Sequence, residues 1–413
     1  MNQRRGLVLM MVLALVGGFP SQGRGQTWTP PDPALVEQAR AILADVPLID
    51  GHNDLPSHVL EDAGGRLDSM DIASPQPELM TDLPRMRAGR LGAQFWSAYV
   101  DVDSVATGAA LRQGLREVDM VHRMVARYPD LELALTADDI VRIHKAGQIA
   151  SLIGLEGGHA IENSLAALRM FYALGVRYMT LTHSATTDWA DAATDRARHG
   201  GLTPFGVDVI HEMNRIGMFV DLSHVSEGTM NDALDVSSAP VIFSHSSARA
   251  LVPAPRDVPD DVLRRVPENG GVVMVTFVPG FVSKAVMDWE NARTAESDSL
   301  RAAGMIGDDL AAAMDGWAKT HPRPRATVAD VADHIDHIRQ VAGIDYIGIG
   351  SDFDGISSTP LGLEDVGDFP MLFAELLRRG YSEEDLRKIA GENLLRAMHQ
   401  MEAVARQEQA AQH

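Results

Sequence analysis

Leu48-Ile49-Asp50-Gly51-His52-Asn53-Asp54 is the stretch of the chain from which the fold can be predicted. A short apolar run ends at Ile49 and is typical of a buried strand, and a glycine precedes His52. Residues two apart in an extended segment point to the same side, so His52 and Asp54 should converge just past the strand end. One nitrogen and one oxygen ligand suit zinc or a similar divalent ion. Such a triplet alone is weak evidence, because it is common on protein surfaces.

Length and composition are those of a globular enzyme. The chain has 413 residues, of which 45% are hydrophobic and 23% charged, enough for one large α/β domain or two ordinary domains. The formal net charge of −21 argues against a nucleic-acid partner, because phosphate binding needs clustered Lys and Arg. The chain has no cysteine, so we expect neither disulfides nor thiol chemistry.

The first 25 residues have the layout of a secretory signal peptide. Arg4 and Arg5 precede an apolar run over 7–16, which small residues follow. The run is short for a membrane span, and the alternative is an uncleaved anchor. We therefore expect an exported protein, periplasmic or secreted, that is not embedded in a membrane after processing. A Pro-rich linker (26–32), one folded domain (33–405) and a polar tail (406–413) should follow.

Apolar strand candidates recur along the chain and alternate with helical patterns. Their runs are nearly continuous, as expected for strands buried on both faces. With the opening strand they are 46–49, 93–100, 149–155, 178–182, 218–222, 241–244, 272–278 and 346–350. Helices are expected at 108–128, 137–146, 164–174, 204–216, 227–236 and 328–342. Eight such units predict a (β/α)8 TIM barrel, with a doubly wound sheet as the alternative.

Two further segments are expected outside these units. Residues 279–325 are longer than a normal crossover, so we expect an insertion near the barrel mouth with a helix over 297–320. Residues 386–405 should form a terminal helix that packs on the barrel, because their apolar positions keep helical spacing.

Chemically active side chains follow six of the expected strands. They are His52 with Asp54, Glu156, His183, His224, His245 and Asp352. The carboxyl ends of TIM-barrel strands surround one mouth, so these scattered residues should meet there. Each has an ordinary alternative, such as a helix cap for Glu156 or a satisfied core histidine for His183.

Together these side chains are enough for two metal ions, and a carboxylate such as Glu156 could bridge them through its two oxygen atoms. Two ions about 3.5–4 Å apart would hold a water between them and lower its pKa toward neutrality. That would supply a hydroxide nucleophile without cysteine or an activated serine. A remaining acid would protonate the departing amine.

The motifs that carry these residues resemble the membrane (renal-type) dipeptidase family, a metallopeptidase branch with amidohydrolase-like barrels. The matching segments are Asp50-Gly-His-Asn-Asp54, Glu156-Gly-Gly, Leu181-Thr-His183, Asp221-Leu-Ser-His224, Phe243-Ser-His-Ser-Ser-Ala248 and Gly350-Ser-Asp-Phe-Asp-Gly355. They keep their order over nearly the whole expected mature chain. With no cysteine and no hydrophobic tail, the chain is more similar to bacterial members than to the disulfide-linked, lipid-anchored mammalian ones.

The resemblance implies a binuclear zinc site with two Zn²⁺ ions per chain. His52 and Asp54 would bind one ion, and His224 and His245 would bind the other. Glu156 and a hydroxide would bridge the two.

The resemblance also implies how a dipeptide is bound and cleaved. His183 would contact the substrate and steady the tetrahedral intermediate, and Asp352 would be the acid–base group. Arg256, eleven residues after His245, would grip the terminal carboxylate of the substrate, a task that suits its planar fork. The implied substrates are small dipeptides. Acceptance of a D-configured C-terminal residue and the existence of a homodimer are left open.

Two other functions stay open on the residues alone. One is a different amidohydrolase, such as a lactonase, deaminase or phosphotriesterase; these typically begin with His-x-His and often use a carboxylated lysine as the bridge. The other is a binding protein that kept the barrel and lost turnover. The complete set of matched ligands, together with Asp352, argues against it.

Other histidines have ordinary interpretations. His58 lies beyond the first strand, and His159 and His199 lie in glycine-rich loops from which they could line the mouth. His334 and His337 are spaced like metal ligands on a helix. We expect them on a solvated polar face instead, because apolar residues beside them form the buried stripe.

Overall fold

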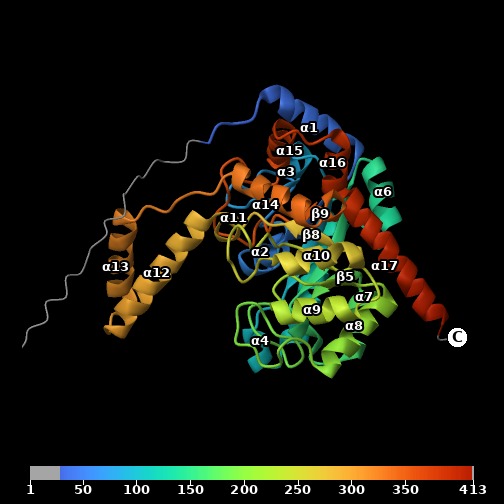
Figure 1. Ribbon diagram of the computed structural model, residues 1–413, viewed down its shortest axis with the longest axis horizontal. Helices are drawn as coiled ribbons and strands as arrows, with labels where there is room; N and C mark the ends of the chain where they lie inside the picture. Colours follow the sequence, from blue (N-terminus) through green and yellow to red (C-terminus); the bar gives the residue numbers. More distant parts are fainter. Residues whose placement is uncertain (1–27, 412–413) are drawn as a thin grey trace, which may run out of the picture.

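A closed barrel of eight parallel strands organises the computed structural model, which describes residues 28–411 (Figure 1). The strand order is β2-β1-β9-β8-β7-β6-β5-β4, and pairing of β2 with β4 closes the ring. This confirms the predicted (β/α)8 barrel, because the edge strands of an open doubly wound sheet would not pair with each other. The expected signal peptide (1–25) lies outside the described residues.

All eight expected strands are present. They are β1 (Leu48–Asn53), β2 (Leu91–Tyr99), β4 (Ile149–Glu156), β5 (Val176–Thr180), β6 (Phe219–Asp221), β7 (Ile242–Phe243), β8 (Val272–Val275) and β9 (Ile347–Ile349). Nearly every residue in them is buried, which explains the continuous apolar runs. A further strand, β3 (Leu131–Leu133), was not predicted because three residues are too few to show a pattern. It pairs with the first residues of β4.

Both ends of each of the six helices expected between strands lie within two residues of the predicted bounds. They are α5 (Ala110–Arg127), α6 (Ala137–Lys145), α7 (Leu165–Ala173), α8 (Pro204–Ile216), α9 (Glu227–Val236) and α14 (Val328–Val341). Ser164, Thr203 and Ser226 begin α7, α8 and α9 by accepting backbone N–H groups of the first turn. The sequence pattern after Asp32-Pro33 also predicts a helix, and α1 (Pro33–Asp45) begins there with Asp32 as its N-cap. Helices that were not predicted are α2, α3, α4, α10 and α15, at Leu55–Glu61, Leu83–Ala88, Asp103–Ala106, Asp260–Asn269 and Phe369–Arg378.

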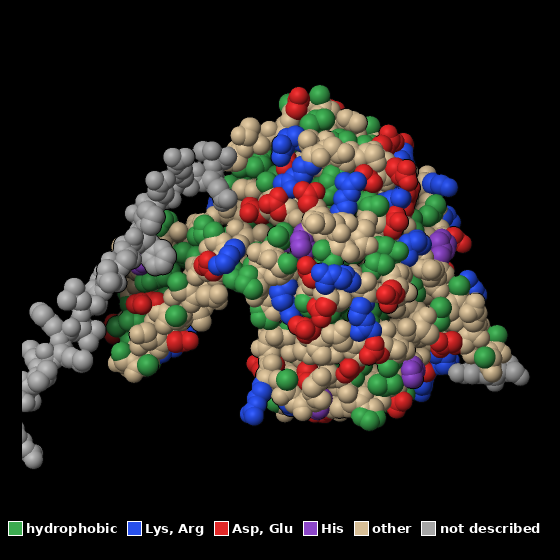
Figure 2. Space-filling view, viewed as in Figure 1, with side chains coloured by type: hydrophobic (Ala, Val, Ile, Leu, Met, Phe, Trp, Pro, Cys, Tyr) green, Lys and Arg blue, Asp and Glu red, His purple; other side chains and the backbone are tan. Residues whose placement is uncertain are grey.

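The expected insertion is a helical hairpin. It starts with α11 (Pro279–Val282) and continues as α12 (Lys284–Ala302) and α13 (Gly307–Thr320), which stand apart from the barrel (Figure 1). An open notch separates the hairpin from the body (Figure 2). The single helix expected over 297–320 is wrong, because the chain breaks after α12, where Gly304 has a φ of 89°. Trp289 and Trp317 join the two helices, with ring centroids 5.5 Å apart.

The C-terminal segment is helical without a break and packs against the barrel, as expected, and it contains one π-helical turn. It consists of α16 (Glu383–Arg387), a π-helical turn (Lys388–Glu392) and α17 (Asn393–Ala410), so α17 also takes in most of the segment expected as a polar tail. Leu394 and Met398 of α17 join the apolar cluster formed by inward-facing residues near the strand starts. None of the helices within residues 28–411 is long and apolar enough to cross a membrane.

Candidate metal centre

The structure brings the residues at the carboxyl ends of the strands into one cluster. The groups whose ligand atoms lie within 4.8 Å of one another are His52 with Glu156 and His245, Glu156 with His183 and His224, and His52 with Asp54 and Asp352. The groups share His52 and Glu156, so they form one connected cluster rather than three separate sites.

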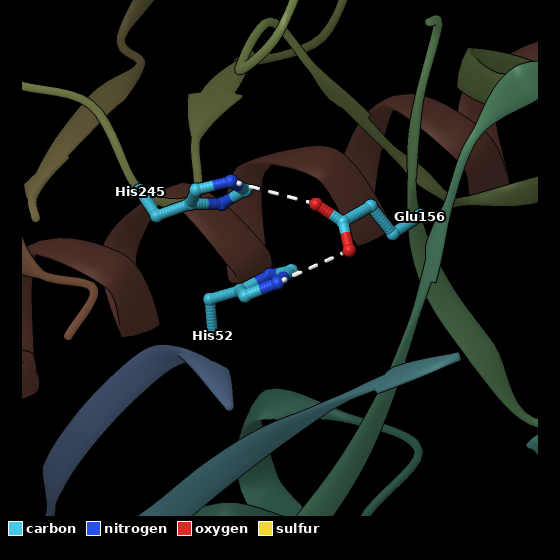
Figure 3. A group of neighbouring side chains, drawn as sticks. All are labelled: His52, Glu156 and His245. Atoms are coloured by element: carbon cyan, nitrogen blue, oxygen red, sulfur yellow. Dashed lines mark ion pairs between the residues drawn. The ribbon is translucent and has the colours of Figure 1, made fainter. Parts of the chain in front are cut away.

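The two carboxylate oxygens of Glu156 face different histidines (Figure 3). Its Oε2 lies 3.4 Å from His52 Nε2, while its Oε1 lies 3.0 Å from His224 Nε2 and 3.6 Å from His245 Nε2. The Nε2 atoms of His224 and His245 are 2.8 Å apart. On the other side, His52 Nε2 lies 3.3 Å from Asp54 Oδ2. The donors therefore divide into two pairs, with Glu156 between them.

Burial and protonation of these side chains suit bound cations. His52 Nε2 is fully buried and has no hydrogen-bond partner within the described chain. Burial, reinforced by nearby positive charge, holds the pKa of His224 and His245 well below the usual value, so both rings are neutral and keep a lone pair to donate. Although burial acts in the opposite direction, His52 and His224 hold the pKa of Glu156 well below its usual range. Although burial opposes it, Tyr178, Glu156 and Asp54 raise the pKa of His52 in the chain without ions, so a cation would replace the proton of that ring. Carboxylates and deprotonated imidazoles are the ligands that zinc prefers, so these residues fit such ions.

Buried aspartates in two of the motifs link neighbouring strand ends by hydrogen bonds. Asp50 accepts hydrogen bonds of 2.7 Å from both the N–H and the hydroxyl of Ser351. Asp221 accepts in the same way from the N–H and the hydroxyl of Ser244. Neither aspartate had a predicted role, yet each fixes the turn from which the next site residue projects.

The backbone at three residues of the site is unusually constrained. His224, Asp352 and Asp354 have positive φ angles of 71°, 67° and 63°, a conformation that costs free energy in residues other than glycine and that concentrates at functional sites. A Cβ at Gly355 would lie 2.2 Å from Asp54 Oδ2 and 2.5 Å from Asp352 Oδ1. Glycine is therefore required for the chain to pass beside these two carboxylates.

A cavity of about 460 Å³ opens onto the cluster. Besides the cluster residues other than His52, its lining includes Ser57, His58 and Glu61 of α2, Val278 just before the insertion and Phe281 within it. The lining thus combines polar groups with an apolar wall, as in sites for small ligands.

Arg256 also lines the cavity and is buried. Its guanidinium donates to Ser246 Oγ and to the His245 carbonyl oxygen, both at 3.3 Å, and its Cζ lies 5.6 Å from the centroid of the Phe281 ring. Both hydrogen-bond partners, in the part of the chain that the structure describes, are neutral. A buried guanidinium of this kind is ready to receive an anion.

Asp352 and His183 complete the wall of the cavity around the cluster. Burial, with the charges of Asp54 and Glu156 adding to it and His52 opposing it, raises the pKa of Asp352 well above its usual value. A carboxyl group of this kind can carry a proton near neutral pH. His183 Nε2 lies 3.8 Å from Glu156 Oε1, and burial lowers the pKa of its ring.

The remaining histidines mostly serve the backbone. His58 does line the cavity, and its Nε2 lies 2.9 Å from the Asp354 carbonyl oxygen. His159 hydrogen-bonds the carbonyl oxygen of Val100 after β2, and His199 hydrogen-bonds that of Thr187 in its own loop; both are absent from the lining of this cavity.

The expected solvated face for His334 is wrong. His334 is buried, and its Nδ1 accepts the N–H of Ala248 at 2.9 Å while its Nε2 lies 3.3 Å from the Val282 carbonyl oxygen. Burial lowers its pKa to about 4, so the ring is neutral. Its neighbour His337 pairs with Asp260. Helical spacing could not reveal a polar side chain buried to satisfy two backbone groups.

Sequence reasoning also missed side chains outside the cluster that contact the candidate metal-binding residues. Ser97 donates to Glu156 Oε2 at 3.0 Å, Tyr178 Oη lies 2.8 Å from His52 Nδ1, and Ser244 Oγ lies 2.8 Å from His245 Nδ1. The signal available in the sequence was strand alternation, which puts polar residues such as Ser97 on the inner face of the barrel.

Comparisons with known proteins match almost the whole chain. The profile of the family described as membrane dipeptidase (peptidase family M19) matches residues 36–412. Dipeptidase 3 of Rattus norvegicus is 42% identical over 378 residues, which cover 90% of this chain and 69% of that protein. Dipeptidase verJ of Clonostachys rogersoniana is 40% identical over 381 residues, covering 90% of this chain and 88% of that protein. The solved structure of the probable dipeptidase PvdM from Pseudomonas aeruginosa has a TM-score of 0.77 at 25% identity, covering 90% of this chain and 99% of that one.

Proposed function

This chain belongs to the membrane dipeptidase family and is a metallopeptidase that hydrolyses dipeptides, and on that premise we propose that it works with a pair of zinc ions. The observation that carries the proposal is the position of Glu156, whose two oxygens face separate donor pairs at 3.4 Å and 3.0 Å. One carboxylate between two donor pairs is what a two-ion site requires.

The residues that would hold the ions divide into two halves, which we name the first and the second half-site. His52 and Asp54 form the first half-site, and His224 and His245 form the second. Glu156 would give one oxygen to each. When bound, the two ions would lower the pKa of a water and polarise the scissile carbonyl.

The other residues would bind the substrate and move the proton. Arg256 would hold the terminal carboxylate, because it is buried beside the cavity with only neutral partners among the described residues. Asp352 would take the proton of the attacking water and pass it to the departing amine, since its raised pKa lets it carry a proton. His183 would donate a hydrogen bond to the oxygen that gains negative charge.

Substrate range follows from where Arg256 lies. Arg256 donates to the carbonyl oxygen of His245, a residue of the cluster, so a carboxylate bound there would lie close to a peptide carbonyl at the cluster, and the substrates should be dipeptides. We include a D-configured C-terminal residue, because Phe281, whose ring centroid lies 5.6 Å from Arg256 Cζ, has no polar group that would select one configuration. Export is proposed on the pattern of residues 1–25 alone.

Metal dependence and substrate length can be tested in one set of assays. The purified protein would be dialysed against a chelator, reloaded with Zn²⁺ and assayed on L-Ala-L-Ala, L-Ala-D-Ala and a tripeptide. We expect activity to vanish with the metal, to return at two zinc ions per chain, and to be confined to dipeptides. Full activity without metal would overturn the zinc proposal, and cleavage of L-Ala-L-Ala alone would overturn the D-residue proposal.

The role of Arg256 has its own test. Arg256→Met should raise KM for dipeptides by about 10-fold or more, with the zinc content unchanged. Arg265→Met is the control, because Arg265 hydrogen-bonds Asn231 and Asp235 away from the cavity. An unchanged KM in Arg256→Met would mean that the carboxylate is held elsewhere.

A further inference from the structure

We infer that Tyr178 and Ser244 are positioning residues that each support one half-site: Tyr178 the first, and Ser244 with Asp221 the second. The inference rests on the proposed two-ion function and extends it to side chains that would touch neither an ion nor the substrate. It assigns each half-site a separate support that can be removed by itself.

Tyr178 determines which nitrogen of His52 carries the proton. Its hydroxyl donates to the Gly51 carbonyl oxygen at 3.2 Å, and its oxygen lies 2.8 Å from His52 Nδ1. Since the hydroxyl hydrogen is used on the carbonyl, the oxygen accepts from His52, which places the imidazole proton on Nδ1. With its proton on Nδ1, His52 can offer the lone pair of Nε2, which has no hydrogen-bond partner in the described chain, to a cation held with Glu156 and Asp54.

The barrel is built to hold the Tyr178 ring in this position. A Cβ at Gly154 of β4 would lie 1.9 Å from Tyr178 Cζ, so any side chain at that position would displace the ring. The ring of Phe95 packs beside it with a centroid distance of 5.0 Å. The phenol is fully buried and is held by residues of β4 and β2, so its hydroxyl is presented to His52 in one orientation.

Ser244 has the corresponding position at the second half-site. Its hydroxyl donates to Asp221 Oδ2, and its oxygen lies 2.8 Å from His245 Nδ1. The hydroxyl hydrogen is again used elsewhere, so Ser244 accepts from His245 Nδ1–H and leaves Nε2 free for a cation. A carboxylate that orients an imidazole through a further hydrogen bond is a recurring support of metal-binding histidines.

Zinc affinity tests the inference directly. Tyr178→Phe and Ser244→Ala each remove one hydroxyl, and Tyr381→Phe is the matched control, because the Tyr381 hydroxyl donates to Asp336. Bound zinc per chain would be measured across a series of buffered free-zinc concentrations. We expect Tyr178→Phe and Ser244→Ala each to bind one of the two ions about 10 to 100-fold more weakly and to regain it at higher zinc. Tyr381→Phe should bind as the wild type does.

A double-variant cycle identifies the half-site on which each support acts. With Asp54→Ala, the remaining ion would be held by the second half-site, so adding Tyr178→Phe should not change its affinity, while adding Ser244→Ala should lower it. With His224→Ala the pattern should be reversed. Equal effects in both backgrounds, or no loss of affinity in either single variant, would overturn the inference.

Folding and function are kept separate in this experiment. Should Ser244→Ala fail to fold, Asp221→Asn interrupts the same chain of hydrogen bonds and is expected to weaken the second half-site. Melting of the metal-free variants checks that the fold is intact. If the ions bind in the expected pattern while no dipeptide is cleaved, the proposed function fails and the inference about Tyr178 and Ser244 stands.

Discussion

The two ends of the barrel differ in what the same strands carry. Toward the amino ends, inward-facing residues such as Ile49 and Phe95 join Leu394 of α17 in one apolar cluster. A few residues further along, the strands end in side chains such as His52 and Glu156, which are buried although they are polar or charged. Apolar burial stabilises the fold, whereas buried polar groups cost stability unless hydrogen bonds or ions satisfy them. Stability and chemistry are thus separated along the barrel axis.

Asp352→Asn tests the end of the barrel that carries the polar cluster, which we call the chemical end, and should have the largest effect. We expect kcat to fall by about 10²- to 10⁴-fold, because the proton carrier is lost. The zinc content should stay the same and the melting temperature should not fall, because burial raises the pKa of Asp352 and the ionised group is costly to bury. Steady-state kinetics, metal analysis and thermal melting measure these quantities. Asp345→Asn at an exposed position is the control, and a normal kcat in Asp352→Asn would remove its assigned role.

Leu394→Ala tests the other end and should have the opposite profile. Leu394 is buried in the apolar cluster below the site, so its truncation should lower the free energy of unfolding by about 2–4 kcal/mol. Zinc affinity and the kcat of the folded protein should not change. Urea unfolding followed by assays on the folded fraction would show this, with the exposed Leu115→Ala as a near-neutral control. A large fall in kcat would mean that the two ends are coupled.

This separation explains why much of the site could be predicted from sequence. A buried strand has a continuous apolar run, so the first His, Asp or Glu after the run is conspicuous, as with Glu156 and Asp352. The barrel then requires such residues to meet at one mouth. The arrangement of the strands and the cluster at their carboxyl ends both follow from this pattern.

The remaining features depend on contacts that local sequence does not show. Tyr178 can lie below His52 only because Gly154, on a neighbouring strand, leaves space for its ring. His334 is buried because two backbone groups distant in sequence reach it, the N–H of Ala248 and the carbonyl of Val282 at the end of α11. The break after α12 follows from Gly304, whereas the apolar spacing continues through it. In each case a partner distant in sequence, or one special backbone conformation, overrides the local pattern.

Glu117 of α5 lies near the chemical end of the barrel, but it belongs neither to the apolar cluster nor to the candidate metal-binding cluster. It is buried, and Ser57 of the cavity lining is its hydrogen-bond donor. Burial, together with the charges of Asp54 and Glu61, raises its pKa to about 8. In the unfolded chain a glutamate releases its proton near pH 4.3, so between roughly pH 4 and pH 8 the folded state keeps a proton that the unfolded state loses. The contribution of Glu117 to the stability of the wild type therefore falls as pH rises through this window and levels off above it.

Glu117→Gln removes this titration and should have the smallest effect of the three substitutions. Relative to the wild type, its free energy of unfolding should rise by roughly 1–3 kcal/mol between about pH 5 and pH 8.5, as urea denaturation would measure. Glu37→Gln, at an exposed position, should show no such trend. Zinc loading should reduce the difference, because an ion at Asp54 would cancel one of the charges that raise the pKa of Glu117. If the free energies of unfolding of Glu117→Gln and the wild type vary with pH in parallel, groups other than those named here stabilise the buried carboxyl. Burying an acidic side chain near the metal centre would then cost the fold little stability.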